Sequence, residues 1–206
     1  SWGSTLAMAY AQTHPQRVNQ LVLRGIFAMT EWEVRWLYQD GAKYLYPDAY
    51  ANFAAPIPED ERRDMIVAYH KRFNGPDETL RQTCARAWSQ WEGALLSLLP
   101  DPETYAKFGE DRFALAFANI ECHYFINKGF LPFDGALLDG VEKMQHIPGV
   151  IIQGRYDVIT PPVTAFELAR RWPNAKLHII PDAGHSSLEP GITDGLVTAT
   201  DSFIRA

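Results

Sequence analysis

The sequence predicts a parallel α/β fold that is interrupted by a long helical insertion. Three short runs rich in β-branched and apolar residues lie at 18–26, 148–157 and 175–185. Segments with helical periodicity flank these runs, so strand and helix alternate in both outer parts of the chain. Such alternation is typical of a parallel sheet covered by helices.

The first helix is expected over residues 4–16, where apolar side chains recur at helical spacing and Pro15 acts as a stop. The run VNQLVLRGI at 18–26 follows directly. Its short, apolar and β-branched character predicts a buried strand.

The second and third strands are expected near the end of the chain, in PGVIIQGRYD (148–157) and AKLHIIPDAGH (175–185). Between them, Thr160 followed by a proline predicts an N-cap and first helical residue, with the helix reaching Trp172. A last helix is expected over about 190–205. This order completes the α/β pattern.

The middle of the chain has a different pattern, with four of the six tryptophans, helical periodicity and no convincing pair of strands. Its proline and glycine residues gather in loops such as FNGPDE and GFLPFDG. We therefore expect a catalytic core formed by 1–27 and 146–206, and a helical cap formed by 28–145.

The composition places the 206-residue chain among ordinary globular proteins, with 47% hydrophobic and 21% charged residues. The net charge of −6, without a basic run, argues against nucleic acid and anionic membranes as partners. No apolar stretch approaches the roughly 18–20 residues that span a bilayer. Cys84 and Cys122 lack CxxC spacing and are expected to be buried thiols, which favours a cytoplasmic location.

Three residues have the order and placement needed for acyl transfer by serine. Such chemistry needs a nucleophilic hydroxyl, an imidazole that accepts its proton, and a carboxylate that orients the imidazole. In the α/β-hydrolase arrangement these follow one another as serine, acid and histidine, at the carboxyl ends of strands. Ser1 precedes the first helix, Asp157 follows the second strand, and His185 follows the third. We expect these three to form a catalytic triad.

Neighbours of Ser1 fit the same interpretation. We expect Gly3 to be required because the turn at the nucleophile brings backbone and helix too close for a Cβ atom. The N–H of Trp2, directly after the nucleophile, is expected to be one oxyanion donor. Taken alone, a serine before a helix such as Ser1 is usually an N-cap, and an aspartate after a strand such as Asp157 is usually a turn or cap residue. The order of the two with His185, on the expected elements, favours catalysis. No pair of histidines has metal-ligand spacing, so neither a metal nor a cofactor is expected.

Several motifs together carry a family resemblance: SWGSTLAMAYAQTHPQRVNQLVLRGIF, WSQWEGALLSLLP, FALAFANIECHYF, GRYDVITP and DAGHSSLEPG. Over essentially the whole chain, the sequence resembles the proline iminopeptidases, which are serine peptidases of the α/β-hydrolase fold. The motifs of the helical middle are the most specific part, since lipases and esterases share the triad. The resemblance implies that Ser1, Asp157 and His185 are the nucleophile, acid and base.

The resemblance also implies substrate-binding residues. Glu92 and Glu121 match glutamates of the family's cap that hold the free N-terminal amine of the substrate, and Phe27 matches an aromatic wall of the proline pocket. Carboxylates in a partly dry cleft suit a cationic nitrogen. Both glutamates border an apolar helical stripe, whereas an ordinary helix glutamate points to water.

The chain departs from the family pattern at its beginning. The family places an HGGPG-type loop and about five strands before the nucleophile, and these supply the second oxyanion donor and over half of the sheet. A three-stranded remnant exposes apolar faces and unpaired strand edges. We therefore expect that Ser1 is not the biological N-terminus, and that an upstream portion of the same fold completes the protein.

The expected activity is release of an N-terminal proline from peptides through an acyl-enzyme. One alternative is another esterase or amidase of the same fold. A second is an N-terminal nucleophile amidohydrolase, in which Ser1 uses its own amine as base; the β-rich runs are too few for the β-sandwich of that class. A third is a fragment without enzymatic activity, whose serine would resist a fluorophosphonate probe.

Overall fold

The computed structural model describes residues 1–204, and the chain divides into two compact units. The first, here called the sheet unit, comprises Ser1–Glu33 and Pro132–Ala206. The second, here called the helical unit, comprises Val34–Leu131. Each unit is described by itself.

The sheet unit is built on three parallel strands in the order β1-β2-β3. Their bounds are Leu21–Arg24 for β1, Gly149–Gly154 for β2 and Ala175–Ile180 for β3. Leu23 of β1 lies opposite Ile151 of β2. The predicted parallel α/β sheet is confirmed, with strands shorter than the apolar runs that predicted them.

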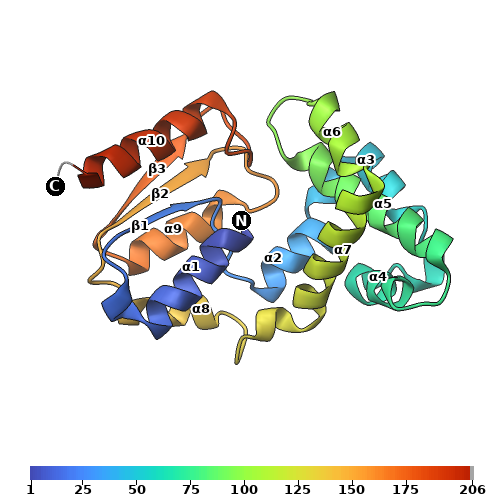
Figure 1. Ribbon diagram of the computed structural model, residues 1–206, viewed down its shortest axis with the longest axis horizontal. Helices are drawn as coiled ribbons and strands as arrows, with labels where there is room; N and C mark the ends of the chain where they lie inside the picture. Colours follow the sequence, from blue (N-terminus) through green and yellow to red (C-terminus); the bar gives the residue numbers. More distant parts are fainter. Residues whose placement is uncertain (205–206) are drawn as a thin grey trace. The chain divides into compact units, whose positions relative to one another are not determined.

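Helices cover both faces of this sheet, with α10 on one face and α1 and α9 on the other (Figure 1). The bounds of the helical elements of this unit are α1 Trp2–Thr13, η1 Pro15–Arg17, α8 Ala136–Asp139, η6 Gly140–Lys143, α9 Pro162–Arg171 and α10 Pro190–Ile204. The short helix α2, Glu31–Arg35, begins at the end of the first segment of the unit.

The central strand β2 forms the core of the sheet unit because all six of its residues are buried. Successive side chains of a strand point to opposite faces. Val150 and Ile152 therefore share one face, where they pack with Ile192 and Ala199 of α10. Ile151 points to the other face, which α9 covers.

The start of α9 corrects one prediction. We expected Thr160 to be the N-cap, but Pro161 occupies that position and Pro162 is the first helical residue. The hydroxyl of Thr160 instead donates to Asp157 Oδ2 at 2.9 Å. The threonine that resembles a helix cap therefore serves the preceding carboxylate.

The helical unit contains helices and no strand among its described residues, as the periodicity of the middle region predicts. Aspartates at 64, 77 and 101 cap three of its helices by accepting a backbone N–H three residues ahead. The bounds are η2 Trp36–Asp40, η3 Ala42–Tyr44, α3 Pro47–Ala54, η4 Glu59–Glu61, α4 Met65–Phe73, α5 Glu78–Leu95, α6 Pro102–Phe108, α7 Asp111–Ile126 and η5 Lys128–Phe130.

An aromatic cluster forms the interior of the helical unit around Trp88 of α5, which is fully buried. Tyr38 stacks on its ring at 4.4 Å between centroids, and Tyr69 meets it edge-on at 5.2 Å. Phe53 stacks on Tyr69 at 4.8 Å. Large rings with few rotatable bonds give this interior a fixed shape.

Both cysteines are free and buried in the helical unit, as predicted. Burial raises the pKa of Cys84 to about 11. Burial, and then the nearby Glu121, raises the pKa of Cys122 to about 12. Both groups are therefore neutral thiols at physiological pH.

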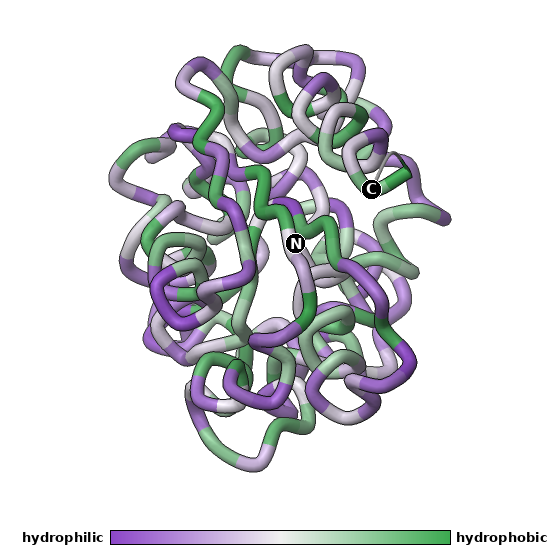
Figure 2. The backbone as a smooth tube through the Cα atoms, turned by 90° about the vertical axis from the view of Figure 1, so that its left-hand side faces the viewer, coloured by the Kyte–Doolittle hydropathy of each residue, from purple (hydrophilic) through white to green (hydrophobic). Residues whose placement is uncertain are grey.

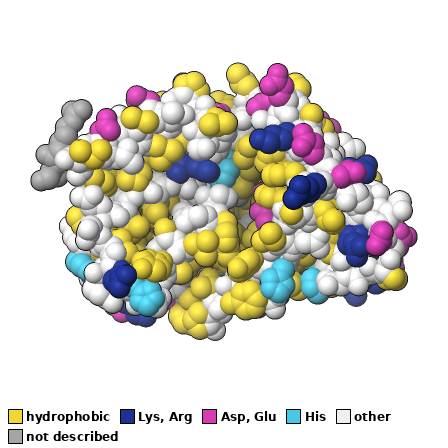
Figure 3. Space-filling model, viewed as in Figure 1, with side chains coloured by type: hydrophobic (Ala, Val, Ile, Leu, Met, Phe, Trp, Pro, Cys, Tyr) yellow, Lys and Arg dark blue, Asp and Glu magenta, His cyan; other side chains and the backbone are white. Residues whose placement is uncertain are grey.

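Hydrophobic residues are distributed along the whole chain. In Figure 2 they recur in short stretches between hydrophilic residues, and Figure 3 shows some of their side chains at the surface of the viewed face. Within residues 1–204, no helix combines the length and the apolar character that a membrane crossing requires.

Candidate active site

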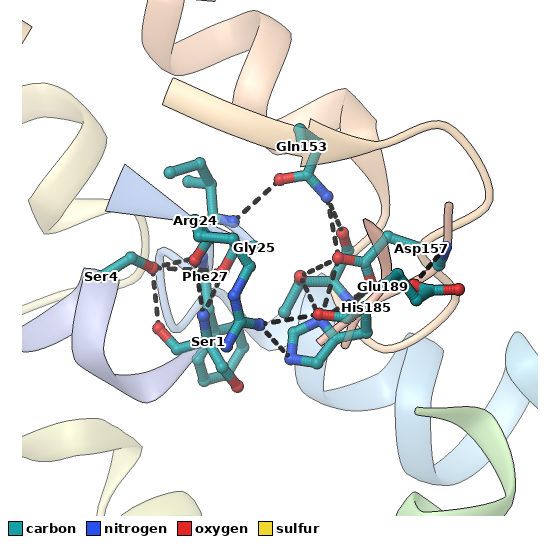
Figure 4. A network of polar contacts seen from close by, with 12 residues as sticks. Ser1, Ser4, Arg24, Gly25, Phe27, Gln153, Asp157, His185 and Glu189 are labelled. Atoms are coloured by element: carbon teal, nitrogen blue, oxygen red, sulfur yellow. Dashed lines mark hydrogen bonds and ion pairs between the residues drawn. The ribbon is translucent and has the colours of Figure 1, made fainter. Parts of the chain in front are cut away.

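The residues expected to be acid and base meet at the carboxyl end of the sheet. Asp157 follows β2 and His185 follows β3, so the parallel order of the strands brings the two loops together. His185 Nδ1 lies 2.8 Å from Oδ2 and 3.0 Å from Oδ1 of Asp157. Each residue is only 3% exposed. The structure thus pairs a buried carboxyl with a buried imidazole (Figure 4).

Arg24, the last residue of β1, fixes the tautomer of His185. Its Nη1 lies 2.9 Å from His185 Nε2 and donates to the carbonyl of His185 at 3.0 Å. A guanidinium is only a donor, so Nε2 must accept and carry no proton. The ring proton therefore sits on Nδ1 and is donated to Asp157. This is the tautomer in which Nε2 can act as a base.

Burial sets the charge state of this pair. Desolvation lowers the pKa of His185 below its usual value and outweighs the opposing effect of Asp157. Burial by itself raises the pKa of Asp157, but His185 and the donors of Thr160 outweigh it, so that pKa lies below its usual value. The site therefore holds an ionised carboxylate beside a neutral imidazole.

Ser1 lies beside this pair at the start of α1. It occupies the N-cap position, yet its side chain makes no capping hydrogen bond. Its amine donates to the carbonyls of Arg24, at 2.9 Å, and Gly25. A Cβ atom on Gly25 would lie 3.2 Å from the Ser1 nitrogen and 2.9 Å from His185 Cε1, so Gly25 separates the two residues.

The structure does not join Ser1 to His185 by a hydrogen bond among the described residues. The acceptor that the hydroxyl of Ser1 needs, Nε2 of His185, is occupied by Arg24. Two of the three predicted triad members are thus in direct contact, and the third lies near them.

The crowding expected at Gly3 is not found among the described residues. Apart from its chain neighbours and the backbone of α1 itself, no heavy atom lies within 4 Å of the position that a Cβ atom would take. The close approach occurs at Gly25, whose φ of +57° is left-handed and whose missing Cβ leaves room for the His185 ring.

Phe27, expected to form a wall of the substrate pocket, is hydrogen-bonded through its backbone to α1, the helix that Ser1 precedes. Its N–H donates to Ser4 Oγ at 3.0 Å, and its carbonyl accepts from Thr5 Oγ1 at 2.6 Å. Its ring centroid lies 6.5 Å from that of Trp2. Trp2 is the first residue of α1, so its N–H belongs to the N-terminal end of the helix, where the helix dipole favours negative charge.

Glu92 and Glu121 form a carboxyl pair inside the helical unit, on α5 and α7. Their side chains are hydrogen-bonded to each other. Tyr38 Oη donates to Glu92 Oε1, and Trp88 Nε1 donates to Glu121 Oε2 at 3.0 Å. Glu92 is 7% exposed. These two glutamates are therefore built into the aromatic interior.

The pair holds a proton. Burial raises the pKa of Glu92, and burial together with the neighbouring Glu92 raises that of Glu121 well above its usual value. Two carboxyls within hydrogen-bonding distance cannot both ionise cheaply, so one of them donates to the other.

Sequence reasoning missed three polar residues of the site: Arg24, Gln153 and Thr160. A signal existed for two of them, since Arg24 ends an otherwise apolar strand and Gln153 lies within one. It also missed Glu33, a carboxyl that is 1% exposed and accepts from the backbone N–H groups of Ala28 and Thr30. No group of histidine, cysteine or acidic residues in the described part of the chain is arranged to hold a metal.

The chain is similar to several curated proteins. It is 52% identical over 204 residues to proline iminopeptidase from Xylella fastidiosa strain 9a5c, covering 99% of this chain and 65% of that protein. It is 52% identical to proline iminopeptidase from Arabidopsis thaliana, covering 98% of this chain and 54% of the relative. The predicted resemblance is thereby confirmed. The chain spans about half to two thirds of the length of these relatives.

Solved structures and a family model agree on the fold. One similar structure is MGS-M2, an alpha/beta hydrolase enzyme from a Medee basin deep-sea metagenome library. The alignment covers 100% of this chain and 63% of the MGS-M2 chain, with a TM-score of 0.56 and 17% sequence identity. For an alpha/beta fold family hydrolase from Bacillus anthracis str. Sterne, the alignment covers 97% of this chain and 64% of the hydrolase chain, with a TM-score of 0.54 and 19% sequence identity. The model of the alpha/beta hydrolase fold matches residues 1–191. The chain therefore belongs to the α/β-hydrolase fold family.

Proposed function

We propose that this protein is a serine exopeptidase that releases an N-terminal proline from peptides. The names of its relatives support this substrate, since proteins 44–52% identical over nearly the whole chain are called proline iminopeptidase. In this proposal the catalytic core expected at 1–27 and 146–206 carries out the chemistry. The helical cap expected at 28–145 recognises the amine of the substrate.

One observation carries the chemical part of this proposal. The imidazole of His185 is neutral, carries its proton on Nδ1 against Asp157, and has Nε2 as an acceptor. That is the state a general base needs before it can take a proton from a hydroxyl.

In the proposed reaction, Ser1 Oγ attacks the carbonyl carbon of the substrate proline while Nε2 of His185 takes the hydroxyl proton. The tetrahedral intermediate collapses, the C–N bond breaks, and His185 returns the proton to the leaving amine. Water then repeats the sequence on the acyl-enzyme and frees proline. Asp157 orients the imidazole and stabilises its cationic form throughout.

Two further residues take part in this scheme. The N–H of Trp2, at the N-terminal end of α1, is one donor to the developing oxyanion. The guanidinium of Arg24 must leave Nε2 before Ser1 can use it, because one lone pair cannot serve both donors.

Glu92 and Glu121 are proposed to bind the cationic ring nitrogen, and Phe27 to pack on the pyrrolidine ring. A carboxyl pair that shares one proton carries a single negative charge, which the cationic nitrogen of the substrate would neutralise in the aromatic interior. Recognition of a free amine restricts cleavage to the first residue of a peptide.

Two other enzyme classes give different expectations. Another esterase or amidase of this fold would use the same triad without selecting an N-terminal amine. An N-terminal nucleophile enzyme needs a β-sandwich between helical layers, whereas the described sheet has three parallel strands, flanked by helices. The family match favours the triad arrangement.

We further propose that the protein acts in the cytoplasm on peptides, independently of nucleic acid, membrane, metal or cofactor. Two free, buried cysteines support a reducing compartment. The net charge of −6 supports the absence of polyanionic partners.

The test compares two substrates and one covalent probe on the natural protein. We expect hydrolysis of proline β-naphthylamide to exceed that of p-nitrophenyl acetate in kcat/KM, and a fluorophosphonate to label Ser1. Ser1→Ala should abolish all three signals, and Ser202→Ala, at an exposed serine, should preserve them. A protein that prefers the acetate ester, or whose labelling survives Ser1→Ala, would contradict the proposal.

A further inference from the structure

Gln153 of β2 is a buried amide with a complete set of partners on two sides. It is 0% exposed. Its Oε1 accepts the N–H of Ile26 at 2.9 Å. Its Nε2 donates to Asp157 Oδ2 and to the carbonyl of Thr160, each at 2.9 Å. The side chain therefore bridges the segment after β1 and the turn after β2 (Figure 4).

These partners leave the amide one orientation. The N–H of Ile26 must face an acceptor, which is the amide oxygen, so the NH₂ group points to Asp157. Burying a glutamine in a central strand is unfavourable unless its polar atoms are satisfied. Here they are satisfied by groups of the candidate active site.

On one side, Gln153 completes the donor set of the acid. Oδ1 of Asp157 accepts the N–H of Thr160 at 2.8 Å, while Oδ2 accepts the Thr160 hydroxyl and the Gln153 amide. His185 Nδ1 faces both oxygens. With its oxygens held this way, the carboxylate has little freedom to rotate away from the imidazole.

On the other side, Gln153 holds the backbone just before Phe27. Gly25 is left-handed, so the chain turns sharply here. Ser4 and Thr5 bind the backbone of Phe27 from α1, and Gln153 binds that of Ile26 from β2. The position of Phe27 is therefore fixed from two elements.

We propose that Gln153 is a positioning residue which ties the orientation of Asp157 to the placement of the segment carrying Phe27. This inference rests on the proposed function, in which Asp157 serves catalysis and Phe27 selects proline. A change at Gln153 should therefore alter both the rate of acyl transfer and the preference for proline.

Two variants separate the two halves of this bridge. Gln153→Met removes both halves at similar side-chain length. Thr160→Val removes one donor to Asp157, together with a hydroxyl that lies 3.2 Å from His185 Nδ1, and does not touch Ile26.

Proline and alanine β-naphthylamides supply the first readout. We expect Gln153→Met to lower kcat/KM for the proline substrate by about 10–100-fold, and to reduce the proline-to-alanine ratio. Thr160→Val should lower the rate while keeping the ratio, because the backbone at Ile26 keeps its acceptor. Equal loss of the ratio in both variants, or its retention in both, would overturn the link.

An NMR titration of the His185 ring supplies a readout that needs no substrate. A carboxylate with one donor fewer attracts the imidazolium more strongly, so both variants should raise the pKa of His185 by about one unit. The titratable groups facing this ring are Asp157, Arg24 and the amine of Ser1; burial lowers the pKa of that amine to about 4, so Asp157 and Arg24 carry the charge near neutral pH. Gln153→Met should also shift the amide resonance of Ile26, and Thr160→Val should leave it in place.

The kinetic and NMR readouts distinguish failure of the proposed function from failure of the role assigned to Gln153. A wild-type protein inactive on proline β-naphthylamide would contradict the proposed function, while the titration and the Ile26 resonance would still test the bridge. An unchanged His185 pKa in Gln153→Met, which removes the donor to Asp157, would overturn the role assigned to Gln153.

Discussion

Nδ1 of His185 lies 2.8 Å from Oδ2 of Asp157, and the two side chains are 4% and 1% exposed. The contact is made where two parallel strands end side by side. Because the ring is neutral and Arg24 occupies its other nitrogen, the direction of this hydrogen bond is fixed. The chemistry proposed for the site depends on that direction.

Asp157→Asn tests the directed hydrogen bond. The amide that replaces the carboxylate can donate to Nδ1, which favours the tautomer that leaves no lone pair on Nε2. We expect kcat/KM for proline β-naphthylamide to fall by about 10⁴-fold, the loss typical of a triad aspartate. The nearby Asp182→Asn, at an exposed position, should keep wild-type rates. A loss below tenfold in Asp157→Asn would show that Asp157 does not orient the base.

The pH dependence of folding tests the state of His185. Its pKa in the folded chain is below the ordinary 6.5, so the unfolded chain takes up the proton first as the pH falls. The free energy of unfolding should therefore decrease as the pH is lowered from 6.5 towards the folded pKa. Urea unfolding at pH 5–7.5 measures this slope.

Two histidine variants control that measurement. His185→Gln should flatten the slope below pH 6.5, and His178→Gln, at an exposed position on β3, should retain it. The same slope in the wild type and in His185→Gln would mean that another group dominates the titration.

The sequence predicted those parts of the site that follow from strand order. Asp157 and His185 each lie in the loop that follows an apolar strand, and the carboxyl ends of neighbouring parallel strands meet at one edge. A residue in such a position is constrained by the fold alone. Its location could therefore be inferred without knowing any side-chain contact.

The remaining contacts could not be predicted because they join segments far apart in the chain. Arg24 reaches His185 across 161 residues, and Gln153 reaches Ile26 across 127. A polar residue in an apolar strand signals that a partner exists but does not identify it. The crowding expected at Gly3, between backbone and helix, is absent among the described residues, whereas the approach of the His185 ring to Gly25 joins segments far apart in the chain.

Gly25→Ala tests that close approach. The substitution forces a left-handed φ on an alanine, which costs about 1–2 kcal/mol, and places its Cβ 2.9 Å from His185 Cε1. We expect lower free energy of unfolding, measured by urea denaturation, together with reduced kcat as the ring is displaced. Gly3→Ala is the matched control and should stabilise α1 by up to about 1 kcal/mol. Equal effects of the two substitutions would contradict the assigned crowding.

Glu92→Gln tests recognition of the substrate amine. The amide keeps the size of the side chain and a partner for Tyr38, but it cannot carry the charge that attracts a cationic nitrogen. We expect KM for proline β-naphthylamide to rise by about 10–100-fold, the effect of losing one charged hydrogen bond. Acylation of Ser1 by p-nitrophenyl acetate, which has no amine, should keep its rate.

The effect of Glu92→Gln can also be measured through the pKa of Glu121. Removing the Glu92 carboxyl removes the repulsion that helps to raise the pKa of Glu121, so that pKa should fall although burial still holds it above its ordinary value. Glu59→Gln, at an exposed position of the helical unit, should alter neither KM nor this titration. If Glu92→Gln reduces proline and acetate hydrolysis equally, Glu92 only supports the packing of α5 and does not bind the amine.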